Sequence, residues 1–187
     1  MIELDTRITL FFNHLGCETL DSFVLLATKT LPWIPFFALL LFFLWKQLGW
    51  KQTLVVLCGV GLCVLICDQF SSHVCKPYFH RLRPTHTPEL EGVVRVVNNY
   101  RAGYPYGFFS AHAANTFSIA TFLSFVFRNR RWTLVLFLWA LICTATRVYL
   151  GVHYFGDVLV GAIFGALVGG GMTCLYCKIY QNGKENT

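Results

Sequence analysis

Long apolar runs alternate with short polar junctions along the chain. Five runs are strongly apolar, and they cover residues 31–45, 53–74, 110–127, 132–148 and 154–176. A helix that spans a bilayer needs about 20 mostly apolar residues, and fewer where its polar ends reach the interface. The pattern therefore predicts an all-α fold, a polytopic transmembrane helical bundle with five clear spans, formed as one domain over residues 1–187.

The first 30 residues carry a weaker pattern. Two short apolar pieces, residues 8–12 and 23–27, are interrupted by Glu18 and Asp21. We expect an interfacial helix here, followed by a short helix within residues 17–30 that adds a sixth crossing. A basic start followed by an apolar segment and a small-residue cleavage site is missing, so no removable signal peptide is expected.

The longest polar stretch, residues 76–109, separates the second and third apolar runs and holds four of the six prolines. Counting crossings places this loop on the same side as the start of the third run and the turn at residues 148–154. The junctions at residues 46–51 and 128–131, and the tail with Lys178 and Lys184, are basic and fall on the other side. Because short basic connections stay in the cytoplasm, we expect a cytoplasmic C-terminus and a periplasmic loop.

Composition agrees with a membrane protein. Hydrophobic residues make up 56% of the chain and charged residues only 13%, which is unlike a water-soluble domain. The net charge of +6 raises nucleic acid as a partner. However, the basic residues lie between apolar runs, so membrane lipids are the expected partners and nucleic acid is excluded.

Three polar segments gather at the predicted outer face. They are KPYFHRLRP at residues 76–84, FSAH at residues 109–112 and TRVYLGVHYFGD at residues 146–157. Forked guanidinium groups suit phosphate oxygens, a lysine adds a point charge, and backbone N–H groups at a helix start bind anions. The grouping therefore predicts a site that binds and transforms a phosphorylated substrate.

These segments resemble the type 2 phosphatidic acid phosphatase superfamily, whose pattern is K-x6-RP, then PSGH, then SR-x5-H-x3-D. The first motif matches fully at Lys76 and Arg83-Pro84, and the third matches at Arg147, His153 and Asp157. Three positions depart from the pattern: Phe109 replaces proline, Ala111 replaces glycine and Thr146 replaces serine. The change from glycine to Ala111 adds a methyl group next to the position expected for the phosphate.

Spacing and chemistry suggest individual roles. His153 and Asp157 are four residues apart, so both lie on one face of a helix that includes them. Asp157 can then bind one ring nitrogen of His153 and orient the imidazole, while the other ring nitrogen attacks phosphorus. The resemblance implies His153 as the nucleophile, His112 as the acid and base, and no metal or other cofactor. The phosphate-binding residues are then Lys76, Arg83, Ser110, Ala111 and Arg147.

Each role has a plainer alternative. Asp157 is also a candidate helix cap, and Arg83 and Arg147 are candidate interfacial residues that extend to the head groups. A metal site at His80, His86, His112 and His153 is disfavoured because nearby arginines repel a divalent cation. The aromatic residues before the second motif are expected to anchor the loop in the head-group layer.

The sequence thus predicts a metal-independent lipid phosphatase at the outer face of the bacterial cytoplasmic membrane, with a phosphohistidine intermediate. Among substrates the favoured order is undecaprenyl diphosphate, then phosphatidylglycerol phosphate or phosphatidate, then a lipid A phosphate. A phosphotransferase between lipid carriers and a noncatalytic anionic-lipid binder or transporter remain alternatives. Oligomeric state is not predicted.

Overall fold

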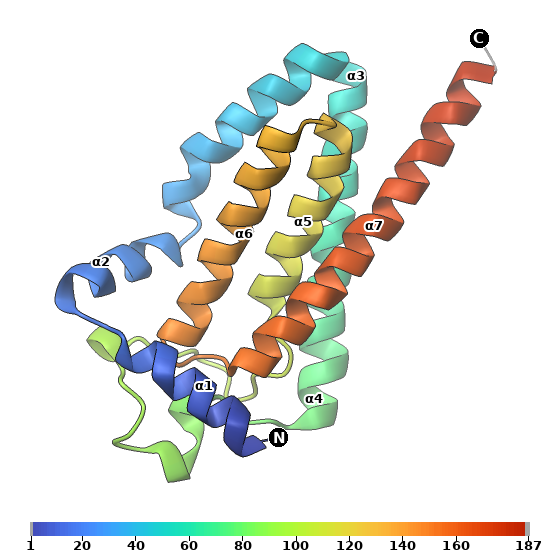
Figure 1. Ribbon diagram of the computed structural model, residues 1–187. Helices are drawn as coiled ribbons and strands as arrows, with labels where there is room; N and C mark the ends of the chain where they lie inside the picture. Colours follow the sequence, from blue (N-terminus) through green and yellow to red (C-terminus); the bar gives the residue numbers. More distant parts are fainter. Residues whose placement is uncertain (1, 186–187) are drawn as a thin grey trace.

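The computed structural model describes residues 2–185, with side chains for residues 3–179. Over this range the fold is helical and has no strand, only an isolated bridge between Leu82 and Tyr106 (Figure 1). The helices are α1 (Ile2–His14), α2 (Glu18–Ala27), α3 (Ile34–Gln69), α4 (Lys76–Phe79), α5 (Ala111–Phe127), α6 (Arg130–Tyr149) and α7 (Phe155–Glu185). A π-helical turn covers Phe70–Cys75, and 3-10 turns cover Leu31–Trp33, Pro84–His86, Pro88–Leu90 and Val97–Asn99.

Helix α3 consists of two arms joined at Gly49. The backbone of Gly49 is not helical there, with φ 73° and ψ 168°, a conformation that glycine adopts without a Cβ clash. The chain reverses at this point, and the second arm diverges from the first as it runs back toward the other end of the bundle (Figure 1). The two arms contain the apolar runs predicted at residues 31–45 and 53–74, and Lys46 and Lys51 flank the reversal.

Within the described residues, three helical stretches are long and apolar enough to cross a membrane: Leu31–Phe79, which includes both arms of α3, Arg130–Tyr149 and Phe155–Ile179. A fourth apolar helix, α5, is slightly shorter at 17 residues. All five predicted apolar runs are therefore helical. Helix α2 has only 10 residues, which is about 15 Å, or half the hydrocarbon thickness, so it gives no support to the predicted sixth crossing.

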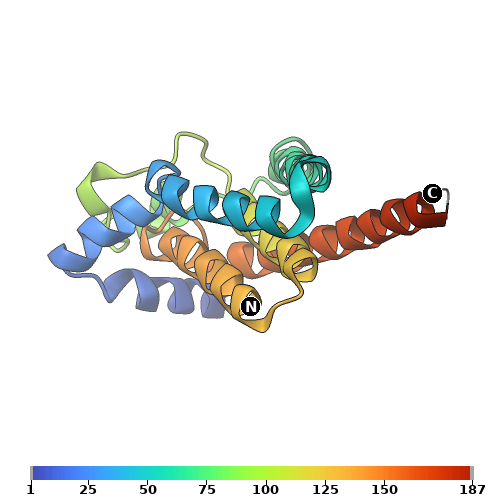
Figure 2. The same cartoon turned by 90° about the horizontal axis from the view of Figure 1, so that it is seen from above.

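Helix α5 lies at the centre of the bundle and packs against α3, α6 and α7. The view from above shows α7 inclined away from the bundle at its C-terminal end (Figure 2). The main apolar core contains Phe122 and Leu123 of α5, Leu136 and Trp139 of α6, and Val56 of α3. Lys184, part of the basic tail, lies outside the described side chains.

Three glycines on one face of α7 bring it into backbone contact with α5. A Cβ added at Gly161, Gly165 or Gly169 would lie 2.6, 2.1 and 2.4 Å from the carbonyl oxygens of Ser110, Ala114 and Ser118. Gly165 and Gly169 thus allow α7 and α5 to approach closely, and Gly161 extends this contact to the start of α5. Gly170 and Gly171 face open space.

We expect Gly165→Ala to weaken the bundle and lower phosphatase activity. The new methyl group must push apart two backbones, an overpacking that costs about 1–3 kcal/mol of unfolding free energy. Thermal unfolding in detergent, together with release of inorganic phosphate, measures both effects. Gly170→Ala is the matched control, since a Cβ at Gly170 meets nothing within 4 Å. Equal melting temperatures for the two variants would contradict the role of this contact.

The N-terminal helices and the long loop cover one end of the bundle (Figure 1). Asn13 of α1 is fully buried, and its amide donates to the carbonyl oxygens of Arg95 in the loop, at 3.0 Å, and Tyr149 of α6, at 2.7 Å. Arg95 also forms a two-pronged ion pair with Asp21 of α2, at 2.6 and 2.8 Å. The loop is therefore fixed to the bundle through α1 and α2.

Candidate active site

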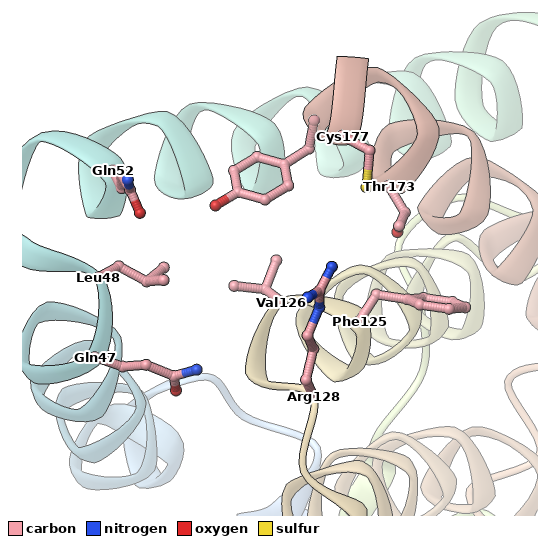
Figure 3. Close-up of a pocket in the computed structure, with 9 residues that line it drawn as sticks. Gln47, Leu48, Gln52, Phe125, Val126, Arg128, Thr173 and Cys177 are labelled. Carbon is pink, nitrogen blue, oxygen red and sulfur yellow. The ribbon is translucent and has the colours of Figure 1, made fainter. Parts of the chain in front are cut away.

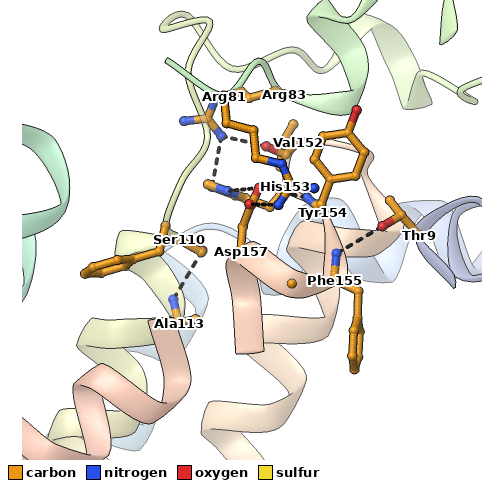
Figure 4. Close-up of polar contacts among 12 residues, drawn as sticks. Thr9, Arg81, Arg83, Ser110, Ala113, Val152, His153, Tyr154, Phe155 and Asp157 are labelled. Atoms are coloured by element: carbon orange, nitrogen blue, oxygen red, sulfur yellow. Dashed lines mark hydrogen bonds and ion pairs between the residues drawn. The ribbon is translucent and has the colours of Figure 1, made fainter. Parts of the chain in front are cut away.

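The three polar segments of the sequence meet at the end of the bundle that α1 covers. His153 lies in the turn between α6 and α7, and Asp157 lies on the first turn of α7. Arg83 comes from the long loop and contacts His153 directly (Figure 4). All three side chains are buried, with exposed fractions of 2% or less for His153 and Asp157 and 6% for Arg83.

Arg83 is held by three contacts at once. Its Nε donates to the carbonyl oxygen of Tyr104 at 2.7 Å, and its Nη1 lies 2.7 Å from the carbonyl oxygen of Val152 and 2.9 Å from His153 Nε2. Burial, together with the charge of Arg147, lowers the pKa of Arg83 to about 10. The guanidinium therefore remains a cation at neutral pH. It is buried within the protein, unlike the interfacial residue considered from the sequence.

The contact with Arg83 assigns the tautomer of His153. A guanidinium can only donate, so Nε2 must be the accepting nitrogen and the ring proton of neutral His153 belongs on Nδ1. Nδ1 faces Asp157 Oδ2 at 3.7 Å. Burial, followed by the charges of Arg83 and Arg147, lowers the pKa of His153 well below its usual value. At neutral pH the imidazole is therefore uncharged, and the electron pair of the unprotonated Nε2 accepts the N–H of Arg83.

Asp157 combines two functions that the sequence left as alternatives. Its Oδ2 accepts the backbone N–H of Tyr154 at 3.0 Å, as a helix cap does, and the same oxygen faces His153. Its Oδ1 accepts from Arg81 Nη1 at 2.6 Å. Gly107 leaves room for this arrangement, because a Cβ there would lie 3.2 Å from Asp157 Oδ2 and 3.5 Å from His153 Nδ1.

Two further cations lie in the same cluster. Arg147 is 4% exposed, and its Nη1 donates to Thr28 Oγ1 at 2.6 Å and to the Tyr100 hydroxyl at 3.1 Å. Lys76 is also buried and donates to Ser72 Oγ at 3.3 Å. The charges of Arg147 and Lys76 both act on His153. Like Arg83, Arg147 points into the protein and does not extend to the interface.

The second motif forms the start of α5. Ser110 is the N-cap, with its Oγ accepting from Ala113 N at 3.4 Å, and its own N–H donates to the carbonyl oxygen of Asp157 at 3.0 Å. Ala111 is buried at the first helical position, and His112 follows with an exposed side chain that interacts electrostatically with Arg147 and His153. Phe109, which replaces the proline of the motif, is buried against Phe164 of α7.

Other residues enter the site that sequence reasoning missed. Arg81 contacts Asp157 and also Asp5 of α1, and Thr28, next to the end of α2, contacts Arg147. Arg81 lies inside the first motif, but the pattern K-x6-RP leaves its position unspecified. The partners of Asp5 and Thr28 are 76 and 119 residues away, a separation that local patterns do not reveal.

A cavity of about 250 Å³ at the opposite end of the bundle is unrelated to this site. Figure 3 shows its lining, which includes Gln47 and Gln52 around the α3 reversal, Arg128 after α5 and Thr173 on α7. The predicted site residues take no part in it. Among the side chains of residues 3–179, no group of three or more His, Cys, Asp or Glu is placed to hold a metal ion.

Residues 62–180 match the family model described as the PAP2 superfamily. This stretch includes every position of the three motifs, from Lys76 to Asp157. The chain belongs to the PAP2 superfamily. The resemblance to type 2 phosphatidic acid phosphatases is thereby confirmed, and this PAP2 protein is a membrane phosphatase, a hydrolase of phosphoric esters.

Curated relatives cover most of the chain. A lipid A 4'-phosphatase of Bacteroides thetaiotaomicron is 38% identical over 169 residues, which is 89% of this chain and 74% of the relative. A lipid A 4'-phosphatase of Porphyromonas gingivalis is 36% identical over 169 residues, 90% of this chain and 71% of the relative.

Two crystal structures share the PAP2 fold described here. Aquifex aeolicus LpxE superimposes with a TM-score of 0.66 at 24% identity, covering 90% of this chain and 94% of that one. A transmembrane PAP2-type phosphatidylglycerolphosphate phosphatase from Bacillus subtilis superimposes with a TM-score of 0.64 at 19% identity, covering 96% of this chain and 86% of that one.

Proposed function

We propose that this PAP2 protein is an inner-membrane lipid phosphatase that removes a phosphate group from a lipid A-type glycolipid. The observation that carries the catalytic part is the contact between Arg83 Nη1 and His153 Nε2, at 2.9 Å, with Asp157 behind the other ring nitrogen. The substrate class follows the two lipid A 4'-phosphatases that are 38% and 36% identical. This ranks a lipid A phosphate above undecaprenyl diphosphate, which the sequence alone favoured.

Hydrolysis proceeds in two displacements. A bound phosphate oxygen takes over the Arg83 N–H, which frees the electron pair of His153 Nε2. Nε2 then attacks phosphorus, the P–N bond forms and the ester P–O bond breaks, and His112 gives a proton to the leaving sugar oxygen. His112 then removes a proton from water, whose oxygen attacks phosphorus as the P–N bond breaks and inorganic phosphate leaves. The neutral state of His153 supports the first step, since a protonated imidazole has no electron pair to donate.

The cations and the start of α5 stabilise the charge that develops on phosphate. Arg83, Arg147 and Lys76 all act electrostatically on His153, so phosphate bound at its Nε2 lies among three positive groups. Ser110 and Ala111 begin α5, whose first N–H groups favour an anion. In this buried setting such interactions are stronger than in water, which is the basis of their catalytic effect.

We place the site at the outer face of the membrane. The basic junctions at residues 46–51 and 128–131 lie at the end of the bundle opposite the turn between α6 and α7 (Figure 1), and short basic connections favour the cytoplasm. We infer five crossings, in which the two arms of α3 count separately. The lipid phosphate then enters from the outer leaflet, where the long loop and α1 lie.

A lipid panel tests the substrate class. Purified protein in detergent with EDTA is given hexa-acylated lipid A, undecaprenyl diphosphate, phosphatidylglycerol phosphate and phosphatidate, and phosphate release is followed with mass spectrometry of the products. We expect kcat/KM for lipid A to exceed that for phosphatidate by about 10-fold or more, a difference of about 1.4 kcal/mol in transition-state binding. Intact spheroplasts, with substrate supplied in the outer leaflet, should show the same release.

Each outcome of this panel discriminates. Preference for undecaprenyl diphosphate would restore the order favoured by the sequence and overturn the glycolipid assignment. Phosphate transfer to an added lipid acceptor in place of water would indicate a phosphotransferase. Tight binding without phosphate release from any of the four lipids would indicate a noncatalytic binder.

A further inference from the structure

Arg81 lies between two carboxylates that come from distant parts of the chain. Its Nη1 donates to Asp157 Oδ1 and its Nη2 to Asp5 Oδ2, both at 2.6 Å (Figure 4 shows its position). The guanidinium also stacks over the ring of Tyr154, with its central carbon 4.1 Å from the ring centre. Burial lowers the pKa of Arg81, but the charges of Asp157 and Asp5 outweigh this and raise it. Arg81 is therefore a fixed cation.

Asp157 depends on this cation to orient His153. The carboxylate is fully buried, and a buried charge without a partner is strongly unfavourable. Arg81 neutralises Oδ1, and the backbone N–H of Tyr154 binds Oδ2, so the carboxylate plane is held with Oδ2 toward His153 Nδ1. Without Arg81 the carboxylate is free to rotate or to take up a proton, and the negative oxygen that lies 3.7 Å from Nδ1 no longer faces the ring.

Helix α1 holds both Arg81 and the helix that carries Asp157. The second oxygen of Asp5 accepts the backbone N–H of Gly156 at 2.7 Å, and Thr9 Oγ1 accepts that of Phe155 at 3.0 Å. These two N–H groups are among the donors at the start of α7 that lack an intrahelical partner, and α1 caps them from outside the helix. A Cβ at Gly156 would lie 2.8 Å from Asp5 Oδ2, which shows how closely α1 lies against α7.

We propose that Arg81 and Asp5 are positioning residues that hold Asp157 against His153, which makes α1 a part of the catalytic apparatus. This inference rests on the proposed function, in which His153 is the nucleophile and Asp157 its partner. Neither side chain contacts the reacting phosphorus. Supporting groups of this kind usually change activity by about 10- to 100-fold when they are replaced.

The test compares Asp5→Asn, Arg81→Gln and Arg81→Lys in the full chain, with lipid A as substrate. Asparagine keeps the size of Asp5 and an oxygen for the Gly156 N–H, but it gives Arg81 no charge. We expect kcat to fall about 10-fold for Asp5→Asn and about 100-fold for Arg81→Gln, with KM changed less than about 2-fold, because phosphate binding is left intact. Arg81→Lys should restore part of the loss by supplying one charged donor to Asp157.

Asp21→Asn is the matched control. The Arg95–Asp21 pair also joins the loop to an N-terminal helix at 2.6 Å, and Asp21 is as little exposed as Asp5, with side chains at 16% and 17%. Neither Asp21 nor Arg95 contacts Asp157 or His153. This variant should lower the melting temperature as much as Asp5→Asn does while keeping kcat within about 2-fold of the original protein, since the catalytic contacts remain.

Two results would overturn the positioning role. One is wild-type kcat in both Asp5→Asn and Arg81→Gln. The other is an equal fall of kcat in Asp21→Asn, which would show that any loosening of the loop has this effect. A failure of the proposed function is seen separately, as phosphate release by the unchanged protein that His153→Ala does not reduce; that result would remove both proposals.

Discussion

Replacing His153 by alanine is expected to lower kcat by about 10⁴-fold or more, as loss of the nucleophile does in other covalent hydrolases. In the neutral ring the electron pair that can attack phosphorus is on Nε2, whereas the side chain of His112 is exposed. Phosphate release from lipid A measures the effect. The unchanged protein, quenched in denaturant during turnover of labelled substrate, should also carry an acid-labile phosphoryl group that His153→Ala lacks.

Two controls separate chemistry from folding. His73→Ala removes an exposed histidine from the π-helical turn and should leave kcat unchanged. His153→Gln keeps a side chain of similar size in the buried turn, so its melting temperature should stay near that of the original protein while its activity is lost. Trapping of labelled phosphate on His153→Ala would show that another residue is the nucleophile.

Arg83→Lys is expected to lower kcat/KM by about 10²- to 10³-fold, comparable with removing a preorganised donor from an oxyanion site. The guanidinium reaches the carbonyl oxygens of Tyr104 and Val152 and the ring of His153 at the same time. A lysine keeps the charge, but its single ammonium group cannot reproduce the fork. Steady-state kinetics at neutral pH, where Arg83 is charged, measures the loss.

Arg101→Lys is the control for this exchange, because Arg101 lies in the same loop with an exposed side chain. It should retain full activity. Arg83→Lys with more than half of the original kcat/KM would mean that charge alone suffices at this position. The forked contact would then be structural, and the assignment of Arg83 as a phosphate ligand would fail.

The bundle was accessible from the sequence because its signals are local. Continuous apolar runs predict where helices lie, and all five runs are helical in the structure. Counting the helices also predicted that Arg83, His153 and Asp157 lie close together. Successive helices run in opposite directions, so the three motifs lie at the same end of the bundle. The reversal at Gly49 lies within the basic junction that was predicted at residues 46–51.

The N-terminal helices were not readable in the same way. Asp5, Asn13 and Asp21 look like ordinary polar residues of an interfacial segment, yet they bind Arg81, Tyr149 and Arg95 across 74 to 136 residues of chain. Such pairs leave no periodicity and no motif. Gly161 was missed for a related reason: a glycine in an apolar run shows its purpose only when the carbonyl oxygen of Ser110 is seen against it.

The way the long loop is fastened has a consequence for redesign. The two ends of the loop are part of the catalytic motifs. Its middle is held by Arg95, which forms hydrogen bonds with the side chains of Asn13 and Asp21. Val97 also packs there against Leu150. If this loop is replaced by that of a relative with another head-group preference, the new loop must therefore keep an arginine and a valine that match Asn13, Asp21 and Leu150. The bundle beneath can be left unchanged.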